Sequence, residues 1–362
     1  MLLERRAFFY IAIIVYFIAL GVVAATTPIT PSEAYRFYHT SDISTFLMHM
    51  GYTRIPSELG LRIFFILFGI FNAFLYYQIT QFFLKKRTDR YLSTLIYLFF
   101  PGVVASSILA NSAIIVSTLI LIFIYAFFRK CWLAVGIALM LLALIHWSAI
   151  IVYMILALYA LIKQEKPLLG ILVLSILFYT CCGVDFSLAR EGSHMLELLS
   201  IYATVFSPLV FIYLFYTLYR ILLRGNRNMI WYLAFFSLMA SLLMSLQYRI
   251  SIVDFSPYIM LGSMLMIQGY YSSLRVRMRR FQNSYRWVFK IVTISLILSS
   301  LSILLNQPIY RTVGKEYFSV FSPVYIPYDR ALELKQNGKK CIEESGVKRL
   351  EQMKFYGIDK CF

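Results

Sequence analysis

The chain has 362 residues, of which 60% are hydrophobic and only 14% are charged, and its mean hydropathy is +0.74. A water-soluble domain cannot bury that much apolar surface, so a soluble globular protein is excluded. The apolar residues form many near-continuous runs and do not alternate with polar ones. This pattern predicts membrane-spanning helices and excludes the strands of a transmembrane barrel. We therefore expect an all-α polytopic membrane protein.

The formal net charge of +17 is the second constraint on function. Basic residues lie in short connectors between apolar runs, as in KKRTDR (85–90), and the largest group is RVRMRRFQNSYR (275–286). Such clusters recur after every second run, as the positive-inside rule requires of cytoplasmic connectors. We therefore expect no nucleic-acid partner, and we expect the basic connectors to attract anionic membrane lipids.

The first apolar run, AFFYIAIIVYFIALGVVAA (7–25), comes after Arg5 and Arg6, and no small-residue cleavage site separates it cleanly from the next segment. We interpret it as a retained first helix with a cytoplasmic N-terminus and not as a signal peptide. The hydropathy pattern predicts about eleven transmembrane helices. Their expected ranges are 7–25, 61–84, 91–110, 112–128, 131–146, 148–162, 167–182, 201–223, 229–247, 258–274 and 287–305.

An odd number of crossings places the C-terminus on the outer side. The predicted organisation is a transmembrane domain over 1–305, with a first outer loop at 26–60, and a small outer tail at 306–362. In the tail, a disulfide between Cys341 and Cys361 would close a loop of about 20 residues and stabilise it by roughly 3 kcal/mol in an oxidising periplasm. Two free thiols are the alternative.

The outer loops hold all four histidines and most of the acidic residues, whereas the cytoplasmic connectors hold few acids. Topology selection acts strongly on Lys and Arg but weakly on acids, so this gathering indicates chemistry on the outer side. In PSEAYRFYHTSDISTFLMHMGY (31–52), Glu33 and Arg36 are three residues apart, and so are His39 and Asp42. Each pair can meet on a helix. The alternative is an amphipathic interfacial helix with solvated charges.

The stretch PSEAYRFYHTSDISTFLMHMGYTRIPSELGLRIFFILFG (31–69) resembles the first outer loop of the GT-C glycosyltransferases. The similarity is to the bacterial branch of aminoarabinose transferases and protein O-mannosyltransferases, and it continues over 97–127 and 141–159. Two positions depart from the family pattern: Ser32 stands at the leading aspartate, and Asn111 stands at the second aspartate. The resemblance implies a GT-C-like bundle with an amphipathic first outer loop.

Such enzymes take a sugar from a polyprenyl-phosphate donor and pass it to an acceptor on the outer side, so the resemblance implies this activity here. The transfer needs a carboxylate that accepts the proton of the nucleophile and positive charge that stabilises the departing phosphate. Serine takes no proton at neutral pH without an activating base, so another group must replace the family's aspartate at Ser32. The catalytic candidates are Glu33, Asp42 and His39.

Arginine side chains are the candidates for the donor phosphate, because a guanidinium group binds phosphate through two hydrogen bonds. They are Arg249, Arg54 and Arg62, and an ion pair between Arg249 and Asp254 that closes their loop is the alternative for the first of them. The candidates for contacts with the sugar or the acceptor are Tyr35, His146 and Trp147.

No cofactor is expected. Glu191, His194 and Glu197 succeed one another at three-residue intervals, which makes a metal site conceivable, but this spacing alone does not support one. The class of protein suggests a multi-pass protein of a bacterial inner membrane, with a periplasmic tail. Two other functions stay open: a non-catalytic scaffold or binder of lipid-linked glycans with the same fold, and a surface-polysaccharide polymerase or ligase. The latter predicts a large late outer loop, whereas the late loops here are short.

Overall fold

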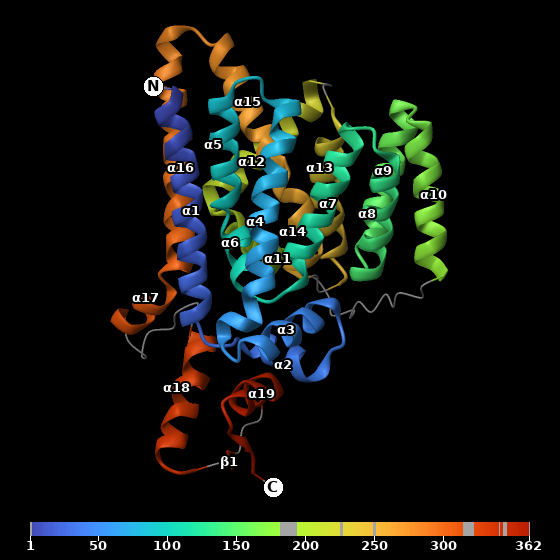
Figure 1. Cartoon of the computed structure of the whole chain (residues 1–362). Coiled ribbons are helices and arrows are strands. Elements are labelled where there is room, and N and C mark those ends of the chain that lie inside the picture. The colour runs from blue at the N-terminus through green and yellow to red at the C-terminus, as the bar shows by residue number, and fades with distance from the viewer. Residues whose placement is uncertain are drawn as a thin grey trace. The chain divides into compact units, whose positions relative to one another are not determined.

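The computed structural model describes residues 2–181, 194–224, 227–248, 251–313, 322–339, 341–342 and 346–361. Figure 1 shows its elements. The first ten helices are α1 (Leu2–Thr26), α2 (Pro31–His39), α3 (Ile43–Arg54), α4 (Glu58–Phe83), α5 (Arg87–Leu98), α6 (Pro101–Ile108), α7 (Ser112–Phe128), α8 (Trp132–Ile145), α9 (Ala149–Lys163) and α10 (Lys166–Cys181). The later elements are α11 (Met195–Phe206), α12 (Pro208–Arg224), α13 (Met229–Met244), α14 (Ile252–Met260), α15 (Gly262–Val276), α16 (Arg279–Leu304), α17 (Asn306–Val313), α18 (Ser322–Gln336), β1 (Cys341–Ile342), α19 (Val347–Phe355) and β2 (Asp359–Lys360).

The protein is an all-α polytopic membrane protein, as its hydropathy predicts. Three helices of the described part are long and apolar enough to cross a membrane on their own: Arg6–Thr26 within α1, α4 and α16. Two bent pairs, α5–α6 and α11–α12, raise this number to five if each pair is one span. Five shorter apolar helices of 10–17 residues accompany them, namely α7, α8, α9, α10 and α13. The count of eleven crossings stays a prediction.

Proline residues break two segments that the sequence predicted as single helices. The predicted helix 91–110 is divided into α5 and α6, which are bent by 61° before Pro101. The predicted helix 201–223 is divided into α11 and α12, which are bent by 102° at Ser207. The residue before a proline is disfavoured in the helical region. Ser207 lies outside that region, with φ of 70° and ψ of 136°. Hydropathy alone does not register such breaks.

The chain divides into two compact units, which we describe separately. Unit 1 comprises residues 1–11, 68–104 and 112–300, and unit 2 comprises residues 12–67, 105–111 and 301–362. Unit 2 thus contains both the predicted first outer loop and the predicted tail.

Unit 1 is a bundle in which α7 packs against α8 and α14, while α9 packs against α10 and α13. The turns α7–α8, α9–α10 and α15–α16 lie at one end of this bundle, and the turn α8–α9 lies at the opposite end (Figure 1). The three turns at the first end carry basic residues, among them Lys130, Lys166 and Arg277. Within unit 1, one end is therefore basic, as the positive-inside pattern predicts.

Unit 2 is held together by contacts between segments far apart in the sequence. Helix α19 packs on α2, and the Gln352 amide donates to the carbonyls of Ile29 and Val324 at 2.7 and 2.9 Å. Helices α3 and α4 approach closely at Gly51 and Gly60, where a Cβ atom on either residue would overlap a backbone carbonyl oxygen. Only glycine allows this approach.

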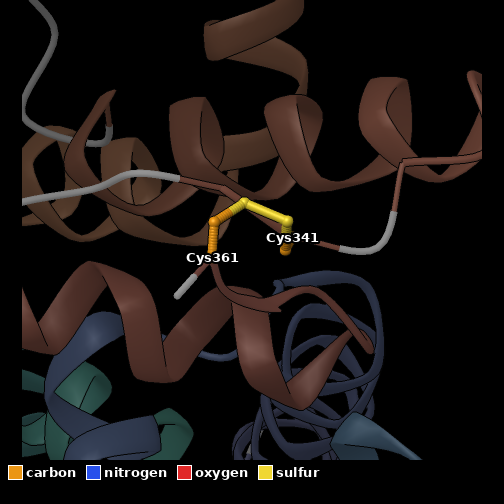
Figure 2. Close-up of a disulfide and its surroundings, with 2 residues drawn as sticks. All are labelled: Cys341 and Cys361. Atoms are coloured by element: carbon orange, nitrogen blue, oxygen red, sulfur yellow. A yellow bond between two sulfur atoms is a disulfide. The ribbon is translucent and has the colours of Figure 1, made fainter.

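The last part of unit 2 is a small α/β element closed by a disulfide. Strands β1 and β2 pair in parallel, and Cys341 and Cys361 are joined with a Cα–Cα distance of 4.9 Å (Figure 2). A hydrophobic cluster lies beneath them, formed by Ala331, Ile342, Met353 and Ile358. The segment predicted as a tail is thus a folded element with its own small core.

Candidate functional site

Glu33 and Arg62 form a buried ion pair in unit 2. The Arg62 Nη2 atom donates to Glu33 Oε2 at 2.7 Å, and its Nε atom donates to Oε1 at 3.2 Å. The backbone N–H groups of Thr30 and Ala110 donate to the same carboxylate at 2.8 and 2.7 Å. The two side chains are 3% and 0% exposed. With four hydrogen bonds, the Glu33 carboxylate has used its full capacity as an acceptor.

The Arg62 guanidinium group is equally saturated. Its Nη1 atom donates to the carbonyls of Ala24 and Thr27 at 2.9 and 2.6 Å, and its Nη2 atom donates to Pro28 at 2.9 Å. Together with the two bonds to Glu33, these contacts use all five N–H groups. The Ala24 carbonyl lies in the last turn of α1, where positive charge is favourable, and those of Thr27 and Pro28 lie just after the helix ends. Arg62 therefore fastens the end of α1 to the start of α2.

The ionisation of Glu33 is set by its surroundings. Burial acts to raise the pKa of its carboxyl group, because burial disfavours the charged form. The charge and hydrogen bonds of Arg62, together with the two backbone N–H groups, act in the opposite direction and prevail, so the pKa of Glu33 is lowered. The carboxylate is ionised at neutral pH, and its oxygens are already engaged.

The other predicted residues of unit 2 lie on α2 and α3. The His39 Nε2 atom lies 2.9 Å from Glu351 Oε1 of α19, a partner that the sequence did not indicate. The Tyr35 ring stacks on the imidazole of His39 at 4.9 Å between centroids. Asp42 is the exposed N-cap residue of α3, and Arg54 is exposed in the last turn of the same helix. These two residues therefore stand at opposite ends of α3.

A second polar cluster lies in unit 1, where α8 ends and α14 begins. The His146 Nε2 atom is 3.2 Å from Asp254 Oδ1. On the other side of the ring, Nδ1 accepts from the backbone N–H of Ser148 at 3.2 Å and lies 2.9 Å from its Oγ atom. That hydroxyl group lies 3.0 Å from the Tyr258 hydroxyl group. Since Nδ1 accepts, the proton of the neutral ring is on Nε2 and is donated to Asp254.

Local sequence places each member of this cluster. His146 is the C-cap residue of α8, with extended backbone angles, and Ser148 is the N-cap residue of α9. Asp254 is in the first turn of α14, where its Oδ2 atom accepts from the backbone N–H of Ser251 at 3.1 Å. Asp254 thus accepts two hydrogen bonds from the described residues, whereas a carboxylate can accept about four. Its side chain is 6% exposed, and that of His146 is 11% exposed.

The residues next to this cluster include the remaining predicted contact. The Trp147 ring meets the Phe255 ring edge-on at 6.0 Å, and its carbonyl accepts from the Tyr179 hydroxyl group at 3.2 Å. Arg249, which the sequence marked as a phosphate ligand, lies outside the described residues. The pairing of His146 with Asp254 had no signal in the sequence, because the two residues are far apart along the chain.

Within the residues that the structure describes, no three His, Cys, Asp or Glu side chains gather as metal ligands do. The His194 Nδ1 atom pairs with Glu197 Oε2 at 2.9 Å, and Glu191 lies outside the described residues.

These features define a polytopic helical membrane protein with charged and hydrogen-bonded clusters in each unit, and comparison with solved structures shows that its fold is similar to that of ArnT. The apo structure of ArnT from Cupriavidus metallidurans matches 97% of this chain and 75% of its own chain, with a TM-score of 0.58 and 12% identity. ArnT from the same organism bound to undecaprenyl phosphate matches 97% and 76%, with a TM-score of 0.57 and 11% identity. No protein-family model and no curated protein matches the sequence. At this identity, the likeness shows the fold alone.

Proposed function

We propose that this protein is a membrane glycosyltransferase that moves a sugar from a polyprenyl-phosphate-linked donor to a lipid, glycan or protein acceptor on the outer side of the membrane. The main support is the ArnT-like fold over 97% of the chain. One of the similar structures holds undecaprenyl phosphate, the kind of carrier that such a donor contains. The resemblance of residues 31–69 to a GT-C outer loop supports the same activity.

In this reaction, an acceptor nucleophile forms a bond to the anomeric carbon while the bond from that carbon to the phosphate oxygen breaks. The lipid phosphate leaves with the bonding electron pair, and the proton of the nucleophile passes to a base on the protein. The enzyme must therefore supply an acceptor for one proton and positive charge beside the departing phosphate.

We assign the base to Asp254, with His146 as the residue that orients it. Within the described residues, the Asp254 carboxylate has two hydrogen-bonding partners, the backbone N–H of Ser251 and the His146 imidazole. The His146 imidazole orients the carboxylate through the contact of its Nε2 atom with Asp254 Oδ1 at 3.2 Å. Asp42 is the rival base, since it is the exposed carboxylate of the first loop.

We assign Glu33 and Arg62 a positioning role. Every oxygen lone pair and every N–H group of this ion pair is engaged, so neither residue is free for a proton or a phosphate without breaking the junction at the end of α1. For the donor phosphate, Arg249 remains the proposed ligand in unit 1, and Arg54 remains the candidate in unit 2 that would accompany the rival base Asp42.

The experiment uses purified protein in lipid nanodiscs with a panel of undecaprenyl-phosphate sugars and a membrane extract as the source of acceptor. We expect release of undecaprenyl phosphate and appearance of the sugar in a new product, with at least one donor. The matched control replaces each donor with the corresponding nucleotide sugar, which should give no product. Absence of transfer from every lipid-linked donor would favour the scaffold or glycan-binding alternative.

A further inference from the structure

A cavity of about 300 Å³ lies between α12, α15 and α16 in unit 1, away from the cluster at His146 and Asp254. It is at the end of the bundle where α12 and α15 end and α16 begins, which is the basic end of unit 1 (Figure 1). Its polar lining includes Arg220, Arg224, Asn228, Gln268 and the hydroxyl groups of Tyr213 and Tyr285.

The cavity is strongly positive. Arg220 and Arg224 are one helical turn apart on α12, so both guanidinium groups reach the same space. Arg220 donates to the hydroxyl group of Ser273, and Arg224 is exposed. Between residues 198 and 315 the sequence contains a single acid, Asp254, which is engaged with His146. The nearby acid that faces α15 is Asp89, and it interacts with the Tyr271 hydroxyl group.

Several neutral groups can complete the coordination of an anion. The hydroxyl groups of Tyr213 and Tyr285 lie 2.9 Å apart, and the Arg277 guanidinium group lies over the Tyr285 ring at 4.2 Å. The Oδ1 atom of Asn228 accepts from the backbone N–H of Trp231, which leaves its amide N–H groups as donors. Guanidinium groups surrounded by hydroxyl and amide donors are typical of phosphate recognition.

The surface beside the cavity indicates which phosphate compound fits. Tyr216 lines the cavity and is 47% exposed, so the cavity opens onto the exposed surface of α12. That surface is apolar, with Ile212, Phe215 and Leu223 all exposed. If the phosphate group of a lipid lies in the cavity, the acyl chains of that lipid can therefore extend along the apolar surface of α12. Basic pockets between transmembrane helices on the cytoplasmic side bind lipid headgroups in this manner.

We propose that this cavity is a binding site for the phosphate headgroup of an anionic membrane lipid, held mainly by Arg220 and Arg224. The site is separate from the proposed transferase chemistry and does not depend on it. The basic connectors are expected to attract anionic lipids in general, and the proposed site is one defined pocket where such a lipid binds.

The test is native mass spectrometry of delipidated full-length protein with phosphatidylglycerol or with phosphatidylcholine added back. We expect preferential retention of phosphatidylglycerol, and we expect the Arg220→Gln/Arg224→Gln variant to lose about tenfold or more in affinity. The matched control is Arg279→Gln/Arg280→Gln, which removes the same charge from exposed positions outside the cavity and should change the affinity by less than about twofold. Size-exclusion profiles verify folding, and Arg224→Gln alone, at an exposed position, should give an intermediate loss.

The competing outcomes are distinct. Equal losses in both double variants would show diffuse charge attraction and overturn the site. Binding of inorganic phosphate that displaces phosphatidylglycerol would identify a soluble phosphate compound as the ligand and overturn the lipid. Equal retention of the two lipids by the wild-type protein would show that no headgroup is recognised.

Discussion

The two units of this protein use the same kinds of charged residue in opposite ways. In unit 2, Glu33 accepts four hydrogen bonds and Arg62 donates five, and both side chains are buried. In unit 1, Asp254 has two hydrogen-bonding partners among the described residues, the His146 imidazole and the backbone N–H of Ser251. A charged group whose hydrogen-bonding capacity is fully used stabilises one arrangement of the chain. A carboxylate that makes fewer hydrogen bonds and lies beside an imidazole can instead take part in a reaction. The number of hydrogen bonds that a charged side chain makes therefore distinguishes a structural residue from a candidate catalytic one, whereas the residue type alone does not.

The largest expected effect concerns activity. The Asp254→Asn variant should reduce the transfer rate by about 10²–10⁴-fold, because it removes the proposed proton acceptor while the amide retains the shape of the side chain. His146→Ala should reduce the rate by less and alter its pH dependence. Transfer kinetics with a lipid-linked donor measure both effects. Asp42→Asn is the matched control: if it loses activity while Asp254→Asn does not, the base lies in the first loop.

The next effect concerns stability. Arg62→Leu should lower the free energy of unfolding by about 3–5 kcal/mol, because it leaves the Glu33 charge buried without its partner. Arg54→Leu removes the same charge from an exposed position and should change stability by no more than about 0.5 kcal/mol. Thermal unfolding in detergent compares the two variants. Similar melting temperatures would show that the ion pair does not hold unit 2 together.

Removal of the disulfide should have a smaller effect, on the stability of the last part of unit 2. Replacing Cys341 and Cys361 with serine opens a loop with a sequence separation of 20 and should cost about 3 kcal/mol in the stability of that element. Limited proteolysis should then cut between α18 and β2 faster than in the wild-type protein. Cys131→Ser, at an exposed free cysteine, is the control. Unchanged proteolysis would indicate that the hydrophobic cluster beneath the strands suffices.

The smallest expected effect is a loss of stability at acidic pH. The pKa of Glu33 is lowered in the folded protein, so its stabilisation is complete above the ordinary glutamate pKa of about 4.3 and is lost as pH falls through the lower folded value. The melting temperature of the wild-type protein should decrease over this acidic window. The melting temperature of Glu33→Gln should decrease less. Parallel curves for the two proteins would assign the acid sensitivity to other groups.

Hydropathy predicted the class of protein and the approximate position of the apolar helices, because lipid requires long uninterrupted runs. It did not predict the bends at Pro101 and Pro208, because both prolines lie within apolar sequence and leave the mean hydropathy unchanged. The prolines themselves were the missed signal. The spacing of Cys341 and Cys361 was sufficient to suggest the bond that the structure contains.

Glu33, Arg62 and His146 could each be recognised from residue type and position in the sequence, whereas their partners could not. The Glu33 carboxylate pairs with Arg62 across 29 residues, and the backbone N–H of Ala110 reaches it across 77 residues. Local periodicity extends over a few helical turns, so it suggested nearer pairs such as Glu33 with Arg36. The partners of a buried charge depend on which helices become neighbours, and a single sequence does not state this.

The proposed function depends on recognition of a lipid-linked phosphate, which can be measured by comparing the binding of undecaprenyl phosphate with that of undecaprenol, its phosphate-free form. The measurement uses the Arg220→Gln/Arg224→Gln variant, so that the proposed site for anionic lipids does not contribute. We expect saturable binding of undecaprenyl phosphate and no binding of undecaprenol at the same concentration. Equal binding of the two lipids, or binding of neither, would contradict a function based on lipid-linked phosphate.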